Sequence, residues 1–584
     1  MKNCYFKCYW LTGLLIIFSQ YATAYDFKQN GICYRLTSVP LRTVSVTSNN
    51  AYYEGDIVIP ATVVYSDVEF SVTAIDDNAF GNWSAYGLDG SAQGENLAKL
   101  TSVKFPSTLK RIGRSAFQGC DGLTNISIPS SVELIDSMAF GNCHNIETVV
   151  IEDGDEDLTG TIPCKNLYLG RNVKSRYWDY YNHQYVYNDA VFYGVTSATI
   201  GKKAQRYGFT GELSEVHFEE GCTVIPDKAF FECKNLESIM LPNTIQTIGS
   251  SAFQGCEVLA NLVIPESVKH IGSQAFAGCI AVSSISLPND VTIGTYLFED
   301  CENLQTVRLS SKITEIPEGM FKGCRNLQPI EFPVDLALIG DYAFENCYFL
   351  MDMVLPDNVI LGNGVFSGCH SMTKVNIPQG NTRIGTSLFK DCWSLRELTI
   401  PTGIEIIEEE AFKGAFKDAP SVEIKLPEGL TKICRNAFTD CGISSISFPT
   451  TLTKIGQNAF DNSTRLKTIS FAASNTSIED YAFNRCEAIE SIYSLMQFPV
   501  LFSDNVFSNM TYLLATLYLP ENSIDIYAST NGWRNFIKVQ TYTGIHSVLT
   551  NDGISDEYYT LSGMRVEKLQ KGIYIIDKKI VVVK

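Results

Sequence analysis

The chain has 584 residues, of which 45% are hydrophobic and 11% aromatic, and its formal net charge is −19. This composition provides enough apolar material for a large buried core and excludes an intrinsically disordered chain. The acidic balance argues against nucleic acid and anionic membrane surfaces as partners. It leaves basic protein patches and neutral sugars open.

The N-terminus has the order of a secretory signal peptide. Lys2 and Lys7 precede an apolar run from Trp10 to Phe18, and the small-residue pattern Ala22-Thr23-Ala24 follows. This order predicts a signal peptide over residues 1–24 and an exported protein, extracellular or at the cell surface. Cleavage would leave 43 basic and 64 acidic residues, a net charge of −21. No later segment offers about 18 uninterrupted apolar residues, so no transmembrane segment is expected.

A phenylalanine recurs along the chain with a short period. Between Phe230 and Phe412 each step to the next repeat phenylalanine is 22 or 23 residues. This period is typical of leucine-rich repeats, and Leu236, Ile239 and Leu241 supply the matching L-x-x-L-x-L core. We expect a β-rich leucine-rich-repeat solenoid, right-handed, with about 16–17 coils, a parallel strand ladder on its concave face, and short helical turns and strands elsewhere. The repeat phenylalanines are Phe80, Phe117, Phe140, Phe230, Phe253, Phe276, Phe298, Phe321, Phe344, Phe366, Phe389, Phe412, Phe438, Phe460, Phe483 and Phe507.

Each position of the repeat unit has a physical role. The first strand ends at a proline such as Pro242, which has no backbone N–H to donate to the ladder. An apolar pair ending at Ile248 predicts a short second strand, and Gly249 permits a turn where a side chain would clash. Ser250 to Phe253 is read as one helical turn, closed by Gly255. The phenylalanine is expected to fill the core.

Cysteine follows the same spacing. Twelve of the sixteen cysteines after residue 24 lie three residues after a repeat phenylalanine. In an exported chain this spacing allows disulfides. Equivalent side chains of stacked coils point the same way, however, and cysteine also serves as a small buried hydrophobe, so we expect reduced, buried thiols. No C-x-x-C pair or Cys/His cluster indicates zinc. The twelve are Cys120, Cys143, Cys233, Cys256, Cys279, Cys301, Cys324, Cys347, Cys369, Cys392, Cys441 and Cys486.

The unit L-x-x-I-x-I-P-x-x-V-x-x-I-G-x-x-A-F-x-G-C resembles that of the BspA-like leucine-rich repeat proteins, which are surface and secreted proteins of Bacteroides-type bacteria and some parasitic protists. The resemblance covers Tyr52 to about Pro520. It implies adhesion to host or neighbouring-cell macromolecules. The segment Leu519 to Phe536 resembles the closing cap of the family, with Tyr527, Trp533 and Phe536 over the last coil.

These features predict the organisation of the chain. The C-terminal tail resembles the end of the sorting domains by which Bacteroidetes export proteins, but it is short, with two or three expected strands. The expected parts are a signal peptide (1–24), an N-terminal cap and degenerate first coil (25–96), the solenoid (97–520) with an irregular insertion (152–210), a C-terminal cap (521–545) and a short β tail (546–584).

The period lapses between Phe140 and Phe230. Degenerate coils are expected around KNLYLG and AVFYG in this gap, but its acidic run, Glu152–Asp157, and its aromatic run, Arg176–Tyr187, depart from the repeat. The acidic run lacks the order of a calcium loop and is expected to be solvated. Six aromatics in twelve residues suit stacking on sugars or anchoring a protein partner, unless the rings fold back and are buried. The candidate ligand-binding residues are Tyr177, Trp178, Tyr180, Tyr181, His183 and Tyr185.

The remaining signals favour binding over catalysis. Outward positions of the expected strand ladder are mostly small hydroxylic and amide residues, not the Trp, Tyr and Arg typical of hot spots. No motif assembles an acid, base or nucleophile, so no enzyme, cofactor or metal site is predicted. We expect a secreted or cell-surface, adhesin-like protein that binds an extracellular protein or glycan through an extended solenoid surface. Alternatives are a glycan-capture protein using residues 176–187 and a passive structural surface protein; the oligomeric state is left open.

Overall fold

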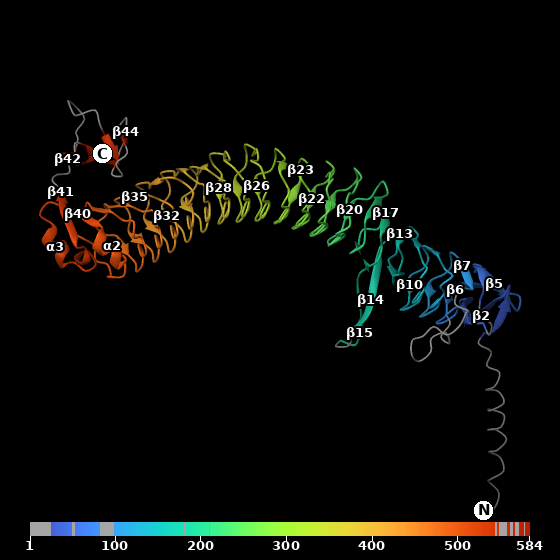
Figure 1. Cartoon of the computed structure of the whole chain (residues 1–584). Coiled ribbons are helices and arrows are strands. Elements are labelled where there is room, and N and C mark those ends of the chain that lie inside the picture. Colours follow the sequence, from blue (N-terminus) through green and yellow to red (C-terminus); the bar gives the residue numbers. More distant parts are fainter. Residues whose placement is uncertain are drawn as a thin grey trace, which may run out of the picture. The chain divides into compact units, whose positions relative to one another are not determined.

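The computed structural model describes residues 25–49, 53–81, 99–179, 182–209 and 211–542, and the backbone of strands in the tail (Figure 1). The expected signal peptide lies outside the described residues. The chain divides into two compact units, Met1–Val268 and Lys269–Lys584. Within the described residues no helix is long and apolar enough to cross a membrane.

The first unit begins with antiparallel strands and continues as a parallel ladder. The longest sheet runs β1-β2-β3-β6-β8-β10-β12-β14-β15, with β5 on β6. Pairing is parallel from β3 to β14 and antiparallel at both ends of the sheet. The strands are β1 (Phe27–Gln29), β2 (Ile32–Ser38), β3 (Thr43–Thr47), β5 (Thr62–Tyr65), β6 (Val68–Ile75), β8 (Arg111–Ile112), β10 (Leu134–Ile135), β12 (Leu158–Thr159), β14 (Val173–Asp179) and β15 (Gln184–Asp189).

A second parallel ladder of this unit passes through the region expected to be irregular. Its central strand β13 pairs with β11 and β17, so the coils expected around residues 166–170 and 190–194 are present. Region 152–210 is therefore built of coils, and the β14–β15 hairpin is the part that departs from them. The ladder consists of β9 (Asn125–Ile128), β11 (Thr148–Ile151), β13 (Asn166–Arg171), β17 (Ser197–Lys203) and β19 (Glu215–Phe218). Shorter pairs are β4 (Gly55–Val58) with β7 (Leu100–Lys104), β16 (Val191–Phe192) with β18 (Gly208–Phe209), and β20 (Val224–Ile225) with β21 (Thr247–Ile248).

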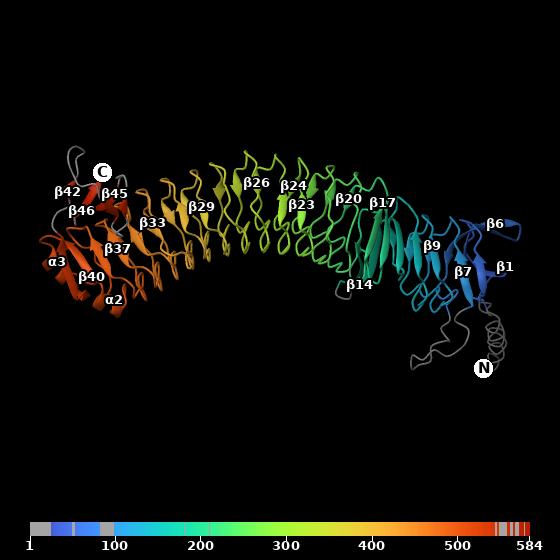
Figure 2. The same ribbon diagram turned by 45° about the horizontal axis from the view of Figure 1, so that its top comes forward.

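The second unit repeats the two-ladder coil (Figure 2). Three of its three-residue strands, Ser284–Ser286, Thr306–Arg308 and Lys374–Asn376, bury the middle residue between two exposed ones, because successive side chains alternate between the faces. The first series of strands forms three separate sheets: β23 (Ser284–Ser286) with β25 (Thr306–Arg308); β29 (Lys374–Asn376) with β31 (Glu397–Thr399); and β33 (Glu423–Lys425), β35 (Ser445–Ser447), β37 (Thr468–Phe471), β39 (Ser491–Ser494), β40 (Thr516–Pro520) and β41 (Lys538–Tyr542). The second series pairs β22 (His270–Ile271) with β24 (Thr292–Ile293); β26 (Glu315–Ile316) with β27 (Leu338–Ile339) and β28 (Ile360–Leu361); and, in order, β30 (Arg383–Ile384), β32 (Ile406–Ile407), β34 (Lys432–Ile433), β36 (Lys454–Ile455) and β38 (Ser477–Ile478).

The repeat phenylalanines form a buried stack inside each unit. In the first unit the Phe117 and Phe140 ring centroids lie 5.0 Å apart with an interplanar angle of 7°. In the second, Phe344 lies 5.4 Å from Phe321 and 5.9 Å from Phe366. Each of these rings is buried. The predicted role of the phenylalanine as the core residue of a continuous leucine-rich-repeat solenoid is confirmed within each unit.

The segment read as a helical turn is instead a pair of tight turns. Ser251 has φ 53°, in the left-handed region, and the equivalent residue is left-handed in many coils. The backbone donors are used between coils: Lys228 N donates to Ser250 O at 2.9 Å, and Phe230 N donates to Ala252 O at 2.8 Å. In a helical turn these N–H groups would bond to carbonyls of their own turn. Because they bond to carbonyls of the next coil instead, the segment is not helical.

The cysteines of the described residues, Cys33 to Cys486, are free thiols, and all except the half-buried Cys434 are buried. The Sγ of Cys324 donates to Phe298 O at 3.1 Å, so the thiol satisfies a carbonyl of the preceding coil. Ser463 occupies the same repeat position and donates to Phe438 O at 2.8 Å. The contact of Cys324 agrees with the expectation of reduced, buried thiols, because its sulfur faces a carbonyl of the preceding coil and not another sulfur.

We expect a thiol reagent to label Cys434 first in the native protein and the other described cysteines only after unfolding. Burial raises the pKa of the Cys324 and Cys347 thiols, so the reactive thiolate is scarce near neutral pH. The measurement is a thiol count with and without denaturant, in the absence of reductant. Cys434→Ala, the control, should remove the fast fraction. A count near zero in denaturant would show disulfides and contradict the assignment.

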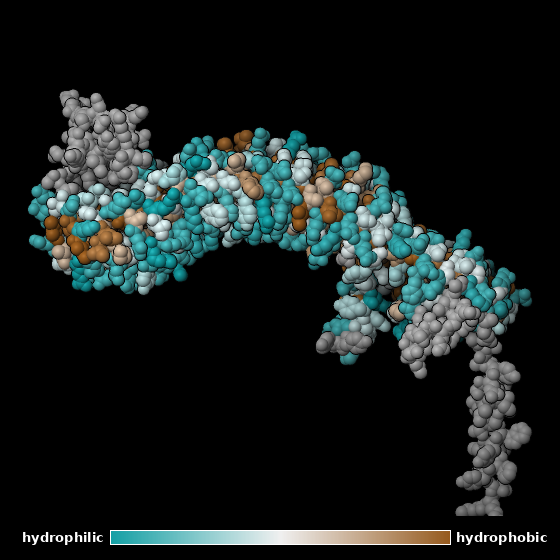
Figure 3. All heavy atoms as spheres, in the orientation of Figure 1, coloured by the Kyte–Doolittle hydropathy of each residue, from teal (hydrophilic) through white to brown (hydrophobic). Residues whose placement is uncertain are grey.

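The last coil is closed by short helices. These are α2 (Asn509–Leu514), α3 (Ile524–Ser529) and the 3-10 turn η2 (Trp533–Asn535). Tyr527, Trp533 and Phe536 are buried, and Trp533 Nε1 donates to Val500 O at 2.8 Å. Figure 3 shows hydrophobic side chains gathered over α2 and α3. The described part of the tail contains five strands, where two or three were expected: β42 (His546–Ser547), β43 (Tyr558–Thr560), β44 (Arg565–Val566), β45 (Gly572–Ile576) and β46 (Lys579–Val583).

Candidate ligand-binding site

The aromatic run folds as the β14–β15 hairpin. The start of β14 continues the coil ladder, since Val173 pairs in parallel with Leu158 of β12. The rest of β14 pairs antiparallel with β15, from Lys174 opposite Asp189 to Asp179 opposite Gln184. Figure 1 shows these strands extending away from the coils of the first unit. The hairpin therefore has a fixed base and a projecting end.

Four residues share one face of the hairpin, which we call the aromatic face: Arg176, Trp178, Tyr185 and Tyr187. Residues directly opposite each other in an antiparallel pair lie on the same side, and Trp178 is opposite Tyr185 as Arg176 is opposite Tyr187. The Trp178 and Tyr185 centroids are 4.9 Å apart with an interplanar angle of 75°. Arg176 Cζ lies 4.5 Å from the Tyr185 centroid, within the range of a cation–π contact.

The rings of the hairpin are exposed. The exposed fractions are 53% for Tyr177, 38% for Trp178, 46% for Tyr185 and 51% for Tyr187. The alternative that these rings fold back and are buried is therefore wrong for these four. The projecting hairpin carries them beyond the coils that would bury them.

The predicted binding residues do not all lie on the same face of the hairpin. Trp178 and Tyr185 are brought together, whereas Tyr177 lies on the opposite face and His183 is exposed in the turn. Tyr180 and Tyr181 lie outside the described residues. Arg176 and Tyr187, at the ends of the aromatic run, were not among the predicted residues. Both could have been predicted if the run had been recognised as a hairpin, because residues two apart in a strand lie on the same face.

Ion pairs hold the aromatic face in place. Arg176 Nη2 lies 2.5 Å from Asp136 Oδ1 of a preceding coil, while its guanidinium also covers Tyr185. Asp136 pairs in addition with Arg111 at 2.6 Å. Because Asp136 and Arg111 belong to the coil body, this network ties the base of the hairpin to the solenoid.

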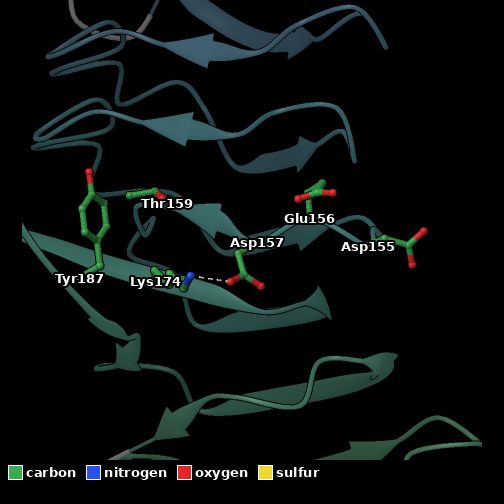
Figure 4. Close-up of a pocket in the computed structure, with 6 residues that line it drawn as sticks. All are labelled: Asp155, Glu156, Asp157, Thr159, Lys174 and Tyr187. Carbon is green, nitrogen blue, oxygen red and sulfur yellow. Dashed lines mark ion pairs between the residues drawn. The ribbon is translucent and has the colours of Figure 1, made fainter.

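A pocket lies at the base of the hairpin, between β14–β15 and the acidic run (Figure 4). Asp157 Oδ2 is 2.7 Å from Lys174 Nζ and also pairs with Arg206. Burial alone would raise the pKa of Asp157, but hydrogen bonds from these cations bring it below its ordinary value. The lining residues are Asp155, Glu156, Asp157, Thr159, Lys174 and Tyr187.

The acidic run is bound to cations of the chain itself. Asp155 pairs with Lys203, and the buried Arg171 donates to the backbone oxygen of Glu156 at 3.2 Å. No group of three or more metal-ligating side chains occurs among the described residues. Four of the six residues of the run, Glu152, Asp153, Asp155 and Glu156, are exposed, in agreement with the solvated loop expected from its composition.

A second aromatic cluster on the second unit was missed by the sequence analysis. Tyr348, His370 and Trp393 stack in successive coils, with centroid distances of 4.6 Å and 3.8 Å. Each follows a repeat cysteine, so a comparison of this repeat position would have found the stack. Burial lowers the pKa of His370, which favours the neutral ring between its neighbours.

The stacked coils define the chain as a leucine-rich-repeat protein. The family model described as "BspA type Leucine rich repeat region (6 copies)" matches residues 95–161, 198–318, 291–417 and 413–532. These segments cover more than half of the chain, which belongs to this family. The match is interrupted between residues 161 and 198, where the β14–β15 hairpin lies, so the aromatic face is an addition to the family repeat.

Similar solved structures are also leucine-rich-repeat proteins. One, from Bacteroides ovatus, is 21% identical, with 80% of this chain and 94% of that chain covered and a TM-score of 0.35. A leucine rich cell surface protein from Faecalibacterium prausnitzii is 22% identical, with 64% and 94% covered and a TM-score of 0.29. No protein with a curated description matches the sequence.

Proposed function

We propose that this chain is an exported, cell-surface binding protein of the adhesin-like kind, which recognises macromolecules of a host or neighbouring cell. The exposed aromatic face of the β14–β15 hairpin carries this proposal. It gathers Arg176, Trp178, Tyr185 and Tyr187 outside the family repeat. Arg, Trp and Tyr are the residue types that contribute most to protein interfaces.

The strand ladder contributes area more than affinity. Its outward residues in the first unit, which also carries the hairpin, include Asn125 and Ser127, which are exposed, small and polar. Such side chains form a solvated rim and few strong anchors. The extended solenoid surface therefore supports a contact that the hairpin anchors. This division of roles favours a binding protein over a passive surface protein.

A protein partner fits the aromatic face better than a flat sugar ring. Arg176 covers Tyr185, and Trp178 meets the same ring at a steep angle. These contacts occupy ring surface on which a sugar would stack. The glycan-capture alternative draws support from the pocket, where Tyr187 lies beside Thr159 and acidic residues, because a ring with nearby hydrogen-bond acceptors suits a sugar (Figure 4).

Trp178→Ala with Tyr185→Ala is expected to weaken binding to an immobilised extracellular-matrix protein panel by at least roughly tenfold, because hot-spot truncation commonly costs about 2 kcal/mol or more. Thermal unfolding should stay unchanged, since both rings are exposed. Surface plasmon resonance on matrix proteins and polysaccharides measures the effect. Tyr193→Ala, an exposed tyrosine of the same unit outside the hairpin, is the matched control.

The panel separates the candidate partners. Loss on matrix proteins with retention on polysaccharides supports the proposed protein partner. Loss on polysaccharides alone would replace it with glycan capture. Equal binding of the double variant and the parent protein on every surface would reject the aromatic face as the contact.

A further inference from the structure

β15 is an exposed edge strand. It ends the long sheet of the first unit, paired on one side with β14, and no strand of the described chain pairs with its other side. Its six residues, Gln184–Asp189, are exposed except for the half-exposed Val186. Exposed edges present unpaired N–H and C=O groups to any other strand.

Most of the usual protections of an edge are missing from β15, whose one charged residue, Asp189, lies at its end. The strand QYVYND contains no proline and no lysine, and its pairing with β14 has no bulge. It combines two aromatic residues and one β-branched residue, which favour strand pairing. In addition, a two-stranded hairpin is only marginally stable in water, so pairing with further strands would stabilise the projecting part.

We propose that two copies of this chain pair through their β15 edges in antiparallel fashion, with Val186 on the twofold axis. This register places Tyr185 opposite Tyr187 of the partner subunit, and Gln184 opposite Asn188 of the partner subunit. Both pairs join similar side chains, and aromatic cross-strand pairs stabilise sheets. A twofold axis through one interface makes the contact self-complementary.

The neighbouring registers fit less well. An axis between Val186 and Tyr187 would set Val186 opposite Tyr187 of the partner subunit. Because these neighbours lie on opposite faces of the strand, the two aromatic faces would then lie on opposite sides of the joined sheet. An axis through Tyr187 would set Tyr185 opposite Asp189 of the partner subunit. Pairing about Val186 keeps both aromatic faces on one side of a four-stranded sheet, where two sets of Arg176, Trp178, Tyr185 and Tyr187 form one surface.

A charge exchange at Val186 tests the pairing without knowledge of the ligand. Sedimentation of the mature protein over a range of concentrations should show a species of twice the monomer mass. Val186→Asp and Val186→Lys each place like charges opposite each other, so each should weaken dimerisation by at least roughly tenfold. An equimolar mixture of the two variants should restore the dimer, because opposite charges then face across the axis.

Tyr177→Lys is the matched control. Tyr177 pairs with Val186 on the same face of the hairpin, but it belongs to β14, which takes no part in the proposed contact, so this variant should dimerise like the parent protein. Circular dichroism and thermal unfolding confirm that every variant is folded. A parent protein that is monomeric at all concentrations, a dimer that persists in both charged variants, or a mixture that fails to restore it would overturn the proposal.

Discussion

Phe344→Ala is expected to lower the free energy of unfolding of the second unit by about 3–5 kcal/mol. The Phe344 ring is fully buried, between Phe321 at 5.4 Å and Phe366 at 5.9 Å, and Phe332 meets it edge-on at 6.2 Å. Alanine would remove the ring and leave a cavity in the stack. Side chains of neighbouring coils cannot fill it, because their backbones are fixed by hydrogen bonds on both sides.

Urea unfolding followed by circular dichroism measures this loss. Phe349→Ala provides a control of the same residue type in the same coil, since Phe349 is 57% exposed. Exposed substitutions away from special features usually change stability by less than about 0.5 kcal/mol. Similar midpoints for the two variants would show that the phenylalanine stack does not stabilise the coils.

The repeat could be predicted because each position depends on local chemistry. Proline ends the strand, isoleucine alternates with polar residues, and phenylalanine recurs at the coil period. The turn before the phenylalanine was assigned incorrectly for a different reason. Ser250 to Phe253 is predicted to be helical from its composition, but the Ser250 and Ala252 backbone oxygens accept hydrogen bonds from Lys228 and Phe230 of the preceding coil. Pairing between coils is a tertiary property, and it overrides the local preference.

The candidate site was only partly predictable. The aromatic run could be recognised because it departs from the repeat, but the partners on each face follow from pairing Trp178 with Tyr185, which requires the position of the turn. A one-residue error in that position would exchange the faces. The role of Arg176 could not be predicted either, because its contact with Asp136 joins residues 40 apart in sequence.

Pairing between coils also explains how the β14–β15 hairpin can be added to this fold. β14 begins as an ordinary coil strand on β12 and only then extends into the hairpin, so the ladder supplies a fixed base. Beyond the hairpin, β17 pairs with β13 and the coils resume. Insertion at one coil thus leaves the neighbouring contacts intact, as expected when each repeat contacts mainly its neighbours.

Gly249→Ala is expected to destabilise the first unit by about 3 kcal/mol, at the upper end of the usual cost of overpacking. A Cβ at Gly249 would lie 2.4 Å from Asp227 N and 2.6 Å from Pro226 C. These are backbone atoms of the preceding coil and cannot rotate away. Separation of the coils would break the bonds from Gly249 N to Ile225 O at 2.8 Å and from Ser250 N to Asp227 Oδ1 at 2.7 Å.

Gly208→Ala is the control for this glycine, because its added Cβ would find its nearest neighbour, Val191 Cγ2, at an ordinary 3.5 Å. Its effect should stay below about 1 kcal/mol. Thermal and urea unfolding of both variants measure the difference. An equal loss in the two would mean that glycine acts through chain flexibility. A large loss at Gly249 alone supports close contact between coils, since the clash depends on the position of the preceding coil.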